Sequence, residues 1–191
     1  QINVSDNRLQ GDYKVMADFV LSEMIQNAEA RNQYLRELKA IHWDQFLNID
    51  RLDQDREQKY VETEQMLQQA HLLAKRYQQQ TLQREQNTLA RAKQLSIKSH
   101  LRHQLTDSLR ESRDSDQTHA LFALELQVLD KADALFQILK NNQWEKKNKT
   151  FMFYQDQPLK QFNDLYKQIL QLNAEIEKIK KQNRQAVEQR L

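Results

Sequence analysis

The scarcity of glycine and proline constrains this chain more than any other feature of its sequence. Gly11 and Pro158 are the single residues of their types among 191. Tight turns, β-bulges and backbone positions with positive φ draw mainly on glycine, so a fold rich in β-sheet is strongly disfavoured. The same scarcity removes the glycine-rich phosphate loop, the dinucleotide fingerprint and the Gly-x-Ser-x-Gly nucleophile elbow. The sequence therefore predicts an all-α fold.

The most apolar window of the chain is the segment from His119 to Leu139. At about 100° per residue, its apolar side chains fall within an arc of roughly 160° on one helix. A face this broad contacts more than one neighbouring helix, so we call this segment the organising helix. Its predicted core side chains are Leu121, Phe122, Leu124, Val128, Leu129, Ala132, Leu135, Phe136 and Leu139.

A first helix is predicted to start after a polar stretch at residues 1–11, which we interpret as a tether. Asp12 is the predicted N-cap of this helix. The helix runs to about Trp43, and residues 42–48 are predicted to form a bend or a connection between helices. The apolar face predicted for the first helix consists of Met16, Phe19, Val20, Met24, Tyr34, Leu35, Leu38 and Ile41.

A long second helix is predicted from about residue 51 to residue 112, with Asn48 or Asp50 as its N-cap. Within it Tyr60, Leu67, Ala74 and Thr81 repeat every seven residues, a spacing typical of coiled coils. The repeat weakens and then resumes in a second register, which predicts a kink or break between residues 78 and 88. Whether this stretch forms one helix or two stays open.

The rest of the chain completes the predicted architecture. Residues 113–118 are predicted to form the turn before the organising helix, and residues 141–158 an irregular segment. Pro158 fits the first turn of a last helix. The sequence thus predicts an elongated antiparallel bundle of four main helices with coiled-coil-like packing, formed as a single domain by residues 12–191.

Several kinds of chemistry have no support in the sequence. The absence of cysteine excludes thiol catalysis, Cys-ligated zinc and disulfides. Asp116 and His119, like His100 and His103, have the spacing of helical neighbours, but we predict that they are solvated side chains and not metal ligands. Residues 75–113 are basic but lack interleaved aromatic side chains that could stack on bases. No catalytic residue, metal site or cofactor is predicted, and nucleic acid is not expected as a partner.

Three ionisable side chains fall within predicted apolar faces, where an unpaired charge would cost several kcal/mol. They are Glu23, His71 and Glu125. We predict that they form a buried polar layer between helices or a partner interface. Ligand binding or catalysis by one of these acids is the alternative.

Five large side chains cluster in the segment before Pro158, namely Trp144, Phe151, Met152, Phe153 and Tyr154. They are too apolar to be exposed together without forming a patch. One interpretation is that they fold back and close the end of the bundle over the organising helix. The other is that they contact a protein partner or a membrane surface, for which the neighbouring Lys146, Lys147 and Lys149 are well suited.

Residues 135–170, LFQILKNNQWEKKNKTFMFYQDQPLKQFNDLYKQIL, resemble the C-terminal part of small all-helical lipoproteins of the Gram-negative envelope, whose function is unknown. The shared features are a long helical bundle, a hairpin that bears aromatic residues, the Phe162-Asn163 pair and a tyrosine that opens the final helix. The chain departs from the group in its glycine-poor body and in lacking the acylated cysteine. The resemblance implies an envelope location and carries no functional residue with it.

We therefore expect a non-enzymatic protein of the cell envelope, periplasmic or lipoprotein-like, an expectation that the start at Gln1 in place of Met also favours. It would act as a scaffold or binding protein through a protein partner or self-association, with peripheral membrane contact as a further possibility. One alternative is an intracellular, cytoplasmic coiled-coil component of a larger assembly such as a secretion or phage apparatus. A second is a small-molecule or lipid carrier, which requires an apolar cavity.

Overall fold

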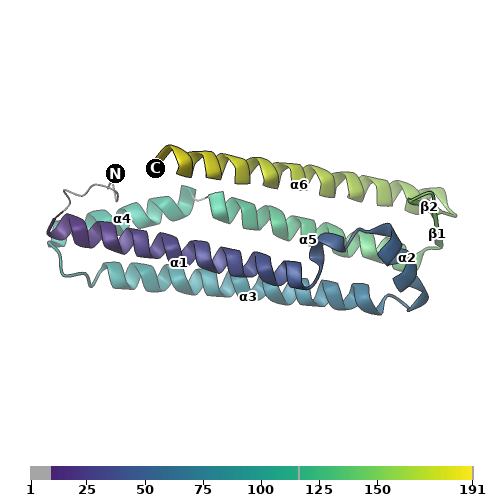
Figure 1. Ribbon diagram of the computed structural model, residues 1–191, viewed down its shortest axis with the longest axis horizontal. Helices are drawn as coiled ribbons and strands as arrows, with labels where there is room; N and C mark the ends of the chain where they lie inside the picture. Colours follow the sequence, from purple (N-terminus) through teal and green to yellow (C-terminus); the bar gives the residue numbers. More distant parts are fainter. Residues whose placement is uncertain (1–9, 116, 191) are drawn as a thin grey trace. The chain divides into compact units, whose positions relative to one another are not determined.

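The computed structural model describes residues 10–115 and 117–190, and 83% of the described structure is helical (Figure 1). The prediction of a mainly α-helical fold is confirmed, with the addition of one small sheet. Most of the predicted tether lies outside the described residues, as does Asp116, which has the spacing of a helical neighbour of His119.

The helical elements, in chain order, are α1 (Asp12–Ala40), the 3-10 helix η1 (Trp43–Gln45), α2 (Ile49–Glu57), α3 (Val61–Ala92), α4 (Ser99–Ser115), α5 (Gln117–Asn141) and α6 (Asp156–Arg190). Two antiparallel strands, β1 (Trp144–Lys147) and β2 (Thr150–Phe153), connect α5 to α6 (Figure 1). The organising helix of the sequence is α5, and the last predicted helix is α6.

The chain divides into two compact units. Of the described residues, unit 1 contains 10–36 and 75–115, and unit 2 contains 37–74 and 117–190. Both units therefore take residues from α1 and from α3. The single domain predicted for residues 12–191 stays a prediction.

The long second helix of the sequence is divided into α2, α3 and α4. The first division follows α2, where Lys59 and Tyr60 have φ values of 58° and 61°. The start of α2 agrees with the sequence, because the Asn48 side chain caps it by accepting a hydrogen bond from the backbone N of Arg51 at 3.1 Å. The second division lies at residues 93–98, between α3 and α4.

The break predicted between residues 78 and 88 is wrong, because α3 continues through this stretch. The glutamines at 78–80 are exposed, and glutamine is a good helix former wherever no core contact is required of it. Just before them, Tyr77 is buried and stacks on Tyr34 of α1 at 4.5 Å between ring centroids. A gap in the heptad pattern therefore reflects a solvated turn of helix.

Unit 2 has its core around α5, which lies alongside α6 (Figure 1). The predicted apolar face of the organising helix is confirmed, since its side chains are buried at Leu121, Leu129, Ala132, Leu135, Phe136 and Leu139 and partly buried at Phe122, Leu124 and Val128. Across from them, α6 contributes Phe162 and Ile169 to the same cluster.

Unit 1 has a smaller core, formed by Met16, Ala92, Ile97, Leu101 and Leu105. Ile97 lies in the connection between α3 and α4, and its burial explains why α3 ends before it. The Arg102 guanidinium secures this connection by donating to the backbone oxygens of Leu95 and Ile97. Asp12 is the first residue of α1, and its carboxylate accepts from the backbone N of Lys98 at 3.0 Å, before α4.

Candidate functional site

A buried carboxylate organises the start of α3. Asp55 of α2 accepts hydrogen bonds from the backbone nitrogens of Glu62 and Thr63, at 3.2 and 2.7 Å, and from the Thr63 hydroxyl at 2.6 Å. The first N–H groups of a helix have no partner within the helix, and the helix dipole favours an anion beside them. Asp55 therefore acts as a cap supplied from outside α3.

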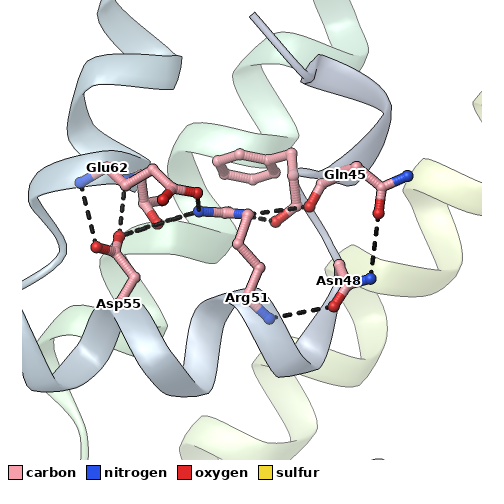
Figure 2. A network of polar contacts seen from close by, with 7 residues as sticks. Gln45, Asn48, Arg51, Asp55 and Glu62 are labelled. Carbon is pink, nitrogen blue, oxygen red and sulfur yellow. Dashed lines mark hydrogen bonds and ion pairs between the residues drawn. The ribbon is translucent and has the colours of Figure 1, made fainter.

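Arg51 extends this network to the connection between α1 and α2, as Figure 2 shows. Its guanidinium donates to the backbone oxygens of Gln45 and Phe46, at 3.0 and 2.7 Å, and to the Thr63 hydroxyl at 2.9 Å. The Glu62 carboxylate lies 3.3 Å away. Because these donors are already satisfied by protein atoms, we assign the network a structural role in unit 2.

The aromatic segment after α5 is a β-hairpin and not the irregular stretch predicted. Trp144 pairs with Phe153 and Lys147 with Thr150, which leaves Asn148 and Lys149 as the two turn residues. Their φ values are 53° and 61°. A type I′ turn needs positive φ at both central positions, which asparagine tolerates and lysine adopts only at a cost. The scarcity of glycine therefore disfavours this turn without preventing it.

Trp144 anchors the hairpin to unit 2. Its indole N–H donates to the Tyr60 hydroxyl at 2.8 Å, and that hydroxyl donates to the backbone oxygen of Leu139 at 3.2 Å. The Arg56 guanidinium lies 4.5 Å from the indole centroid and also donates to the backbone oxygen of Trp144. The buried Trp144 thus joins α5 to the turn between α2 and α3.

The other hairpin aromatics pack mainly against α6. Phe151 and Phe153 lie 4.6 and 5.3 Å from Phe162, measured between ring centroids. Phe153 is buried, and Phe151 and Met152 are partly buried. Tyr154 is 51% exposed, and its hydroxyl donates to Glu145 at 2.5 Å. These contacts hold the hairpin against α6, and they leave Tyr154 the most accessible of the five candidate contact residues.

The three residues of the predicted polar layer have different surroundings. Glu23, in unit 1, is buried, and its carboxylate accepts from the Thr88 hydroxyl at 2.5 Å and from the Arg91 guanidinium. The expectation that His71 is buried is wrong. Its side chain is 46% exposed and pairs with Asp133 at 2.6 Å within unit 2. Glu125, also in unit 2, is partly buried.

Burial of Tyr60 predicts a loss of stability in strong alkali. Burial raises the pKa of the Tyr60 phenol above its ordinary value of 10.0, so the folded protein holds this proton more tightly than the unfolded chain. The contribution is complete below about pH 10 and is lost as the pH rises further, because only the unfolded chain ionises readily there. Urea unfolding between pH 8 and 11 should show a smaller fall in stability for Tyr60→Phe than for the unmodified protein. Tyr13→Phe, which removes an exposed phenol, is the control, and equal slopes for Tyr60→Phe and the unmodified protein would contradict the expectation.

One exposed apolar stripe of α1 was not anticipated from the sequence. We define the α1 outer face as Leu21, Met24 and Ile25, which are 41%, 50% and 50% exposed. Beside it lies a shallow, open hollow of about 350 Å³, lined by Asp18, Leu21, Ser22, Ile25 and Gln26. The placement of Met24 on the buried face of the first helix is therefore wrong. The rest of the predicted face is confirmed, since Met16, Tyr34 and the Glu23 predicted beside them are buried.

The sequence did contain a signal for the α1 outer face. Leu21, Met24, Ile25 and Ala28 have the i, i+3, i+4, i+7 spacing of a second apolar stripe on the same helix. This stripe is shorter than the predicted buried face, which extends from Met16 to Ile41. Arg91 and Thr88 bind the buried Glu23 carboxylate in unit 1, and with Glu23 buried there Leu21 and Ile25 are exposed.

Within the described ranges, no three or more His, Cys, Asp or Glu side chains are grouped so that they could hold a metal ion. His100 and His103 are exposed near the start of α4. None of the described helices is both long enough and apolar enough to cross a membrane.

Comparison with protein-family models, characterised proteins and solved structures finds no match to this chain. The resemblance of residues 135–170 to envelope lipoproteins therefore stays a prediction. What the protein does has to be inferred from its own residues.

Proposed function

We propose that this protein is a non-enzymatic helical scaffold or binding protein of the cell envelope that contacts its partner through the α1 outer face. The observation that carries the proposal is the exposure of three large apolar side chains on one stripe of α1, next to a hollow rimmed by polar residues. Single exposed apolar residues are ordinary on protein surfaces, but a contiguous set of them is typical of an interaction site.

The framework that presents this face is, in our proposal, an elongated antiparallel bundle of the four long helices α1, α3, α5 and α6. Two observations support it. The hairpin returns the chain so that α6 lies alongside α5 in unit 2 (Figure 1). The heptad positions of α3 at Leu67 and Ala74 are buried, as coiled-coil-like packing requires.

Burial of this heptad seam also bears on the choice between the functional alternatives. In an intracellular assembly component with α3 as its docking rod, the seam residues would have to face a partner. The chain itself instead buries Leu67, Ala70, Ala74 and Tyr77 of α3. This favours an envelope scaffold that binds through α1, while the envelope location itself rests on the resemblance of residues 135–170.

Site-specific photocrosslinking in cells that express the complete gene tests this proposal. A photoreactive amino acid at position 21 or 25 should give covalent adducts in the envelope fraction, because these side chains contact the partner. Position 170 is the matched control, since Leu170 is a similarly exposed apolar residue on α6.

Two results would contradict the proposal. Adducts no more abundant at positions 21 and 25 than at position 170 would rule out the α1 outer face as the contact surface. Protein found only in the cytoplasmic fraction would remove the envelope location. A lipid or small molecule that copurifies with the chain in native mass spectrometry would favour the carrier alternative instead.

A further inference from the structure

We infer that the α1 outer face binds a second copy of this chain, with the two α1 helices antiparallel about a two-fold axis between Leu21 and Ser22. The inference rests on the proposed function and names the partner of the same surface. It follows from the apolar residues of this face together with the charges at its two ends.

The apolar part of the face is suited to a symmetric contact. A two-fold contact uses one patch twice, so the patch must be complementary to itself. With the axis between Leu21 and Ser22, the two Leu21 side chains meet near the axis. Ile25 of each copy then lies opposite Asp18 of the other, beside the hollow that Asp18, Leu21 and Ser22 line. On both sides of the axis, Ile25 of one copy thus faces the hollow of the other copy.

The charges at the ends of the face set the direction of the helices. Lys14 lies two helical turns before Leu21, and Glu29 lies one turn after Ile25, so both adjoin the apolar stripe. Antiparallel pairing about the proposed axis places Lys14 of each copy opposite Glu29 of the other. Parallel pairing in register would instead place lysine beside lysine and glutamate beside glutamate. Charge complementarity therefore favours the antiparallel pair.

Both charged groups are available for this contact. The Lys14 ammonium pairs with Asp18 at 3.2 Å, but both side chains are well exposed, and an exposed pair of this kind is weak and easily rearranged. Glu29 is exposed, and within the described parts of the chain it has no ion-pair partner. In the proposed pair each Lys14 lies between its own Asp18 and Glu29 of the other copy.

The contact is short, which sets its expected strength. From position 14 to position 29 the helix is about 24 Å long. One pair of helices in contact over this length gives an interface at the small end of the range for specific complexes. We therefore expect an equilibrium between monomer and dimer that depends on protein concentration.

Sedimentation equilibrium over a range of concentrations tests the inference through charge reversal. Lys14→Glu and Glu29→Lys should each weaken self-association roughly tenfold, because each places two like-charged pairs in the interface. The double variant, which restores opposite charges in reversed order, should associate about as well as the unmodified chain. Leu21→Asp should abolish association. At concentrations where the unmodified chain is monomeric it should not change the melting temperature, because Leu21 is exposed in the monomer.

Disulfide crosslinking tests the geometry, and the absence of native cysteine makes it simple. Leu21→Cys should form a covalent dimer on mild oxidation, whereas Leu170→Cys should not. A mixture of Lys14→Cys and Glu29→Cys proteins should give the mixed dimer, while each protein alone should give none. Dimers formed by each of these two proteins alone would overturn the antiparallel arrangement.

Experiments can contradict the inferred self-association and the proposed function independently of each other. Unmodified protein that stays monomeric at all concentrations, while photocrosslinks from positions 21 and 25 in cells contain a different protein, overturns self-association and leaves the proposed function standing. A monomer without crosslinked partners overturns both. Crosslinked species with twice the mass of the chain support both.

Discussion

Replacing Asp55 with alanine is expected to lower the free energy of unfolding by about 3 kcal/mol, one of the two largest effects predicted for this protein. The carboxylate accepts three hydrogen bonds from Glu62 and Thr63. The substitution leaves two N–H groups at the start of α3 without their partner. It also leaves the Arg51 guanidinium, 3.9 Å from Asp55, without a nearby buried anion.

Urea unfolding followed by circular dichroism measures this loss. Glu57→Ala is the matched control, because it removes one negative charge from the same helix at an exposed position. We expect this control to change stability by less than about 0.5 kcal/mol. Equal effects of the two substitutions would mean that Asp55 acts only as a surface charge and does not cap α3.

Replacing Trp144 with alanine is expected to cost about 3 to 5 kcal/mol, the usual range for removing a large buried aromatic side chain. The substitution removes the indole from the core and takes the hydrogen-bond donor away from Tyr60. It also removes the ring beneath the Arg56 guanidinium. Phe153→Ala should destabilise in the same direction, because Phe153 is buried against Phe162.

Thermal unfolding of these variants decides how the hairpin is used. Tyr154→Ala is the control from the same hairpin, because that side chain is about half exposed. If Trp144→Ala lowers the melting temperature by many degrees and Tyr154→Ala changes it little, the hairpin closes over the organising helix. Unchanged stability of Trp144→Ala, with loss of binding to a partner or to liposomes, would instead identify the hairpin as a contact surface.

In the proposed scaffold, the Asp55 network and the Trp144 anchor would stabilise the fold, whereas the α1 outer face would bind the partner. The Arg51 and Asp55 network and the Trp144 anchor lie in unit 2, where they hold the connections between helices. The α1 outer face lies in unit 1, and its large side chains contribute little to the core there. Substitutions in the Asp55 network or at Trp144 should therefore change the free energy of unfolding. Substitutions in the α1 outer face should change association.

Local features of the sequence were sufficient for the helices themselves. The buried face of α5 was predicted from the spacing of residues such as Leu129, Leu135 and Phe136, and the cap at Asn48 from its residue type. Helical periodicity and capping depend on residues within a few positions of one another. The long helices α1, α5 and α6 could therefore be predicted without knowledge of their neighbours, whereas α3 was predicted only as part of a longer helix.

The ends of helices and the exposure of their faces depended on tertiary contacts. The ends of α2 and α3 reflect the Asp55 cap and the burial of Ile97, neither of which the heptad pattern indicates. The hairpin forms despite a turn without glycine, because burial of Trp144 and Phe153 offsets the cost of that turn.

The α1 outer face shows this dependence on tertiary contacts most clearly. The sequence by itself determined that α1 is amphipathic and predicted most of its buried face, but it placed Met24 on that face and did not show what would pair with Glu23. That partner is Arg91, 68 residues away in the chain, which binds the Glu23 carboxylate and so stabilises its burial. A buried carboxylate requires such a partner, and only the folded chain brings one to it. Leu21, Met24 and Ile25 are exposed as a consequence.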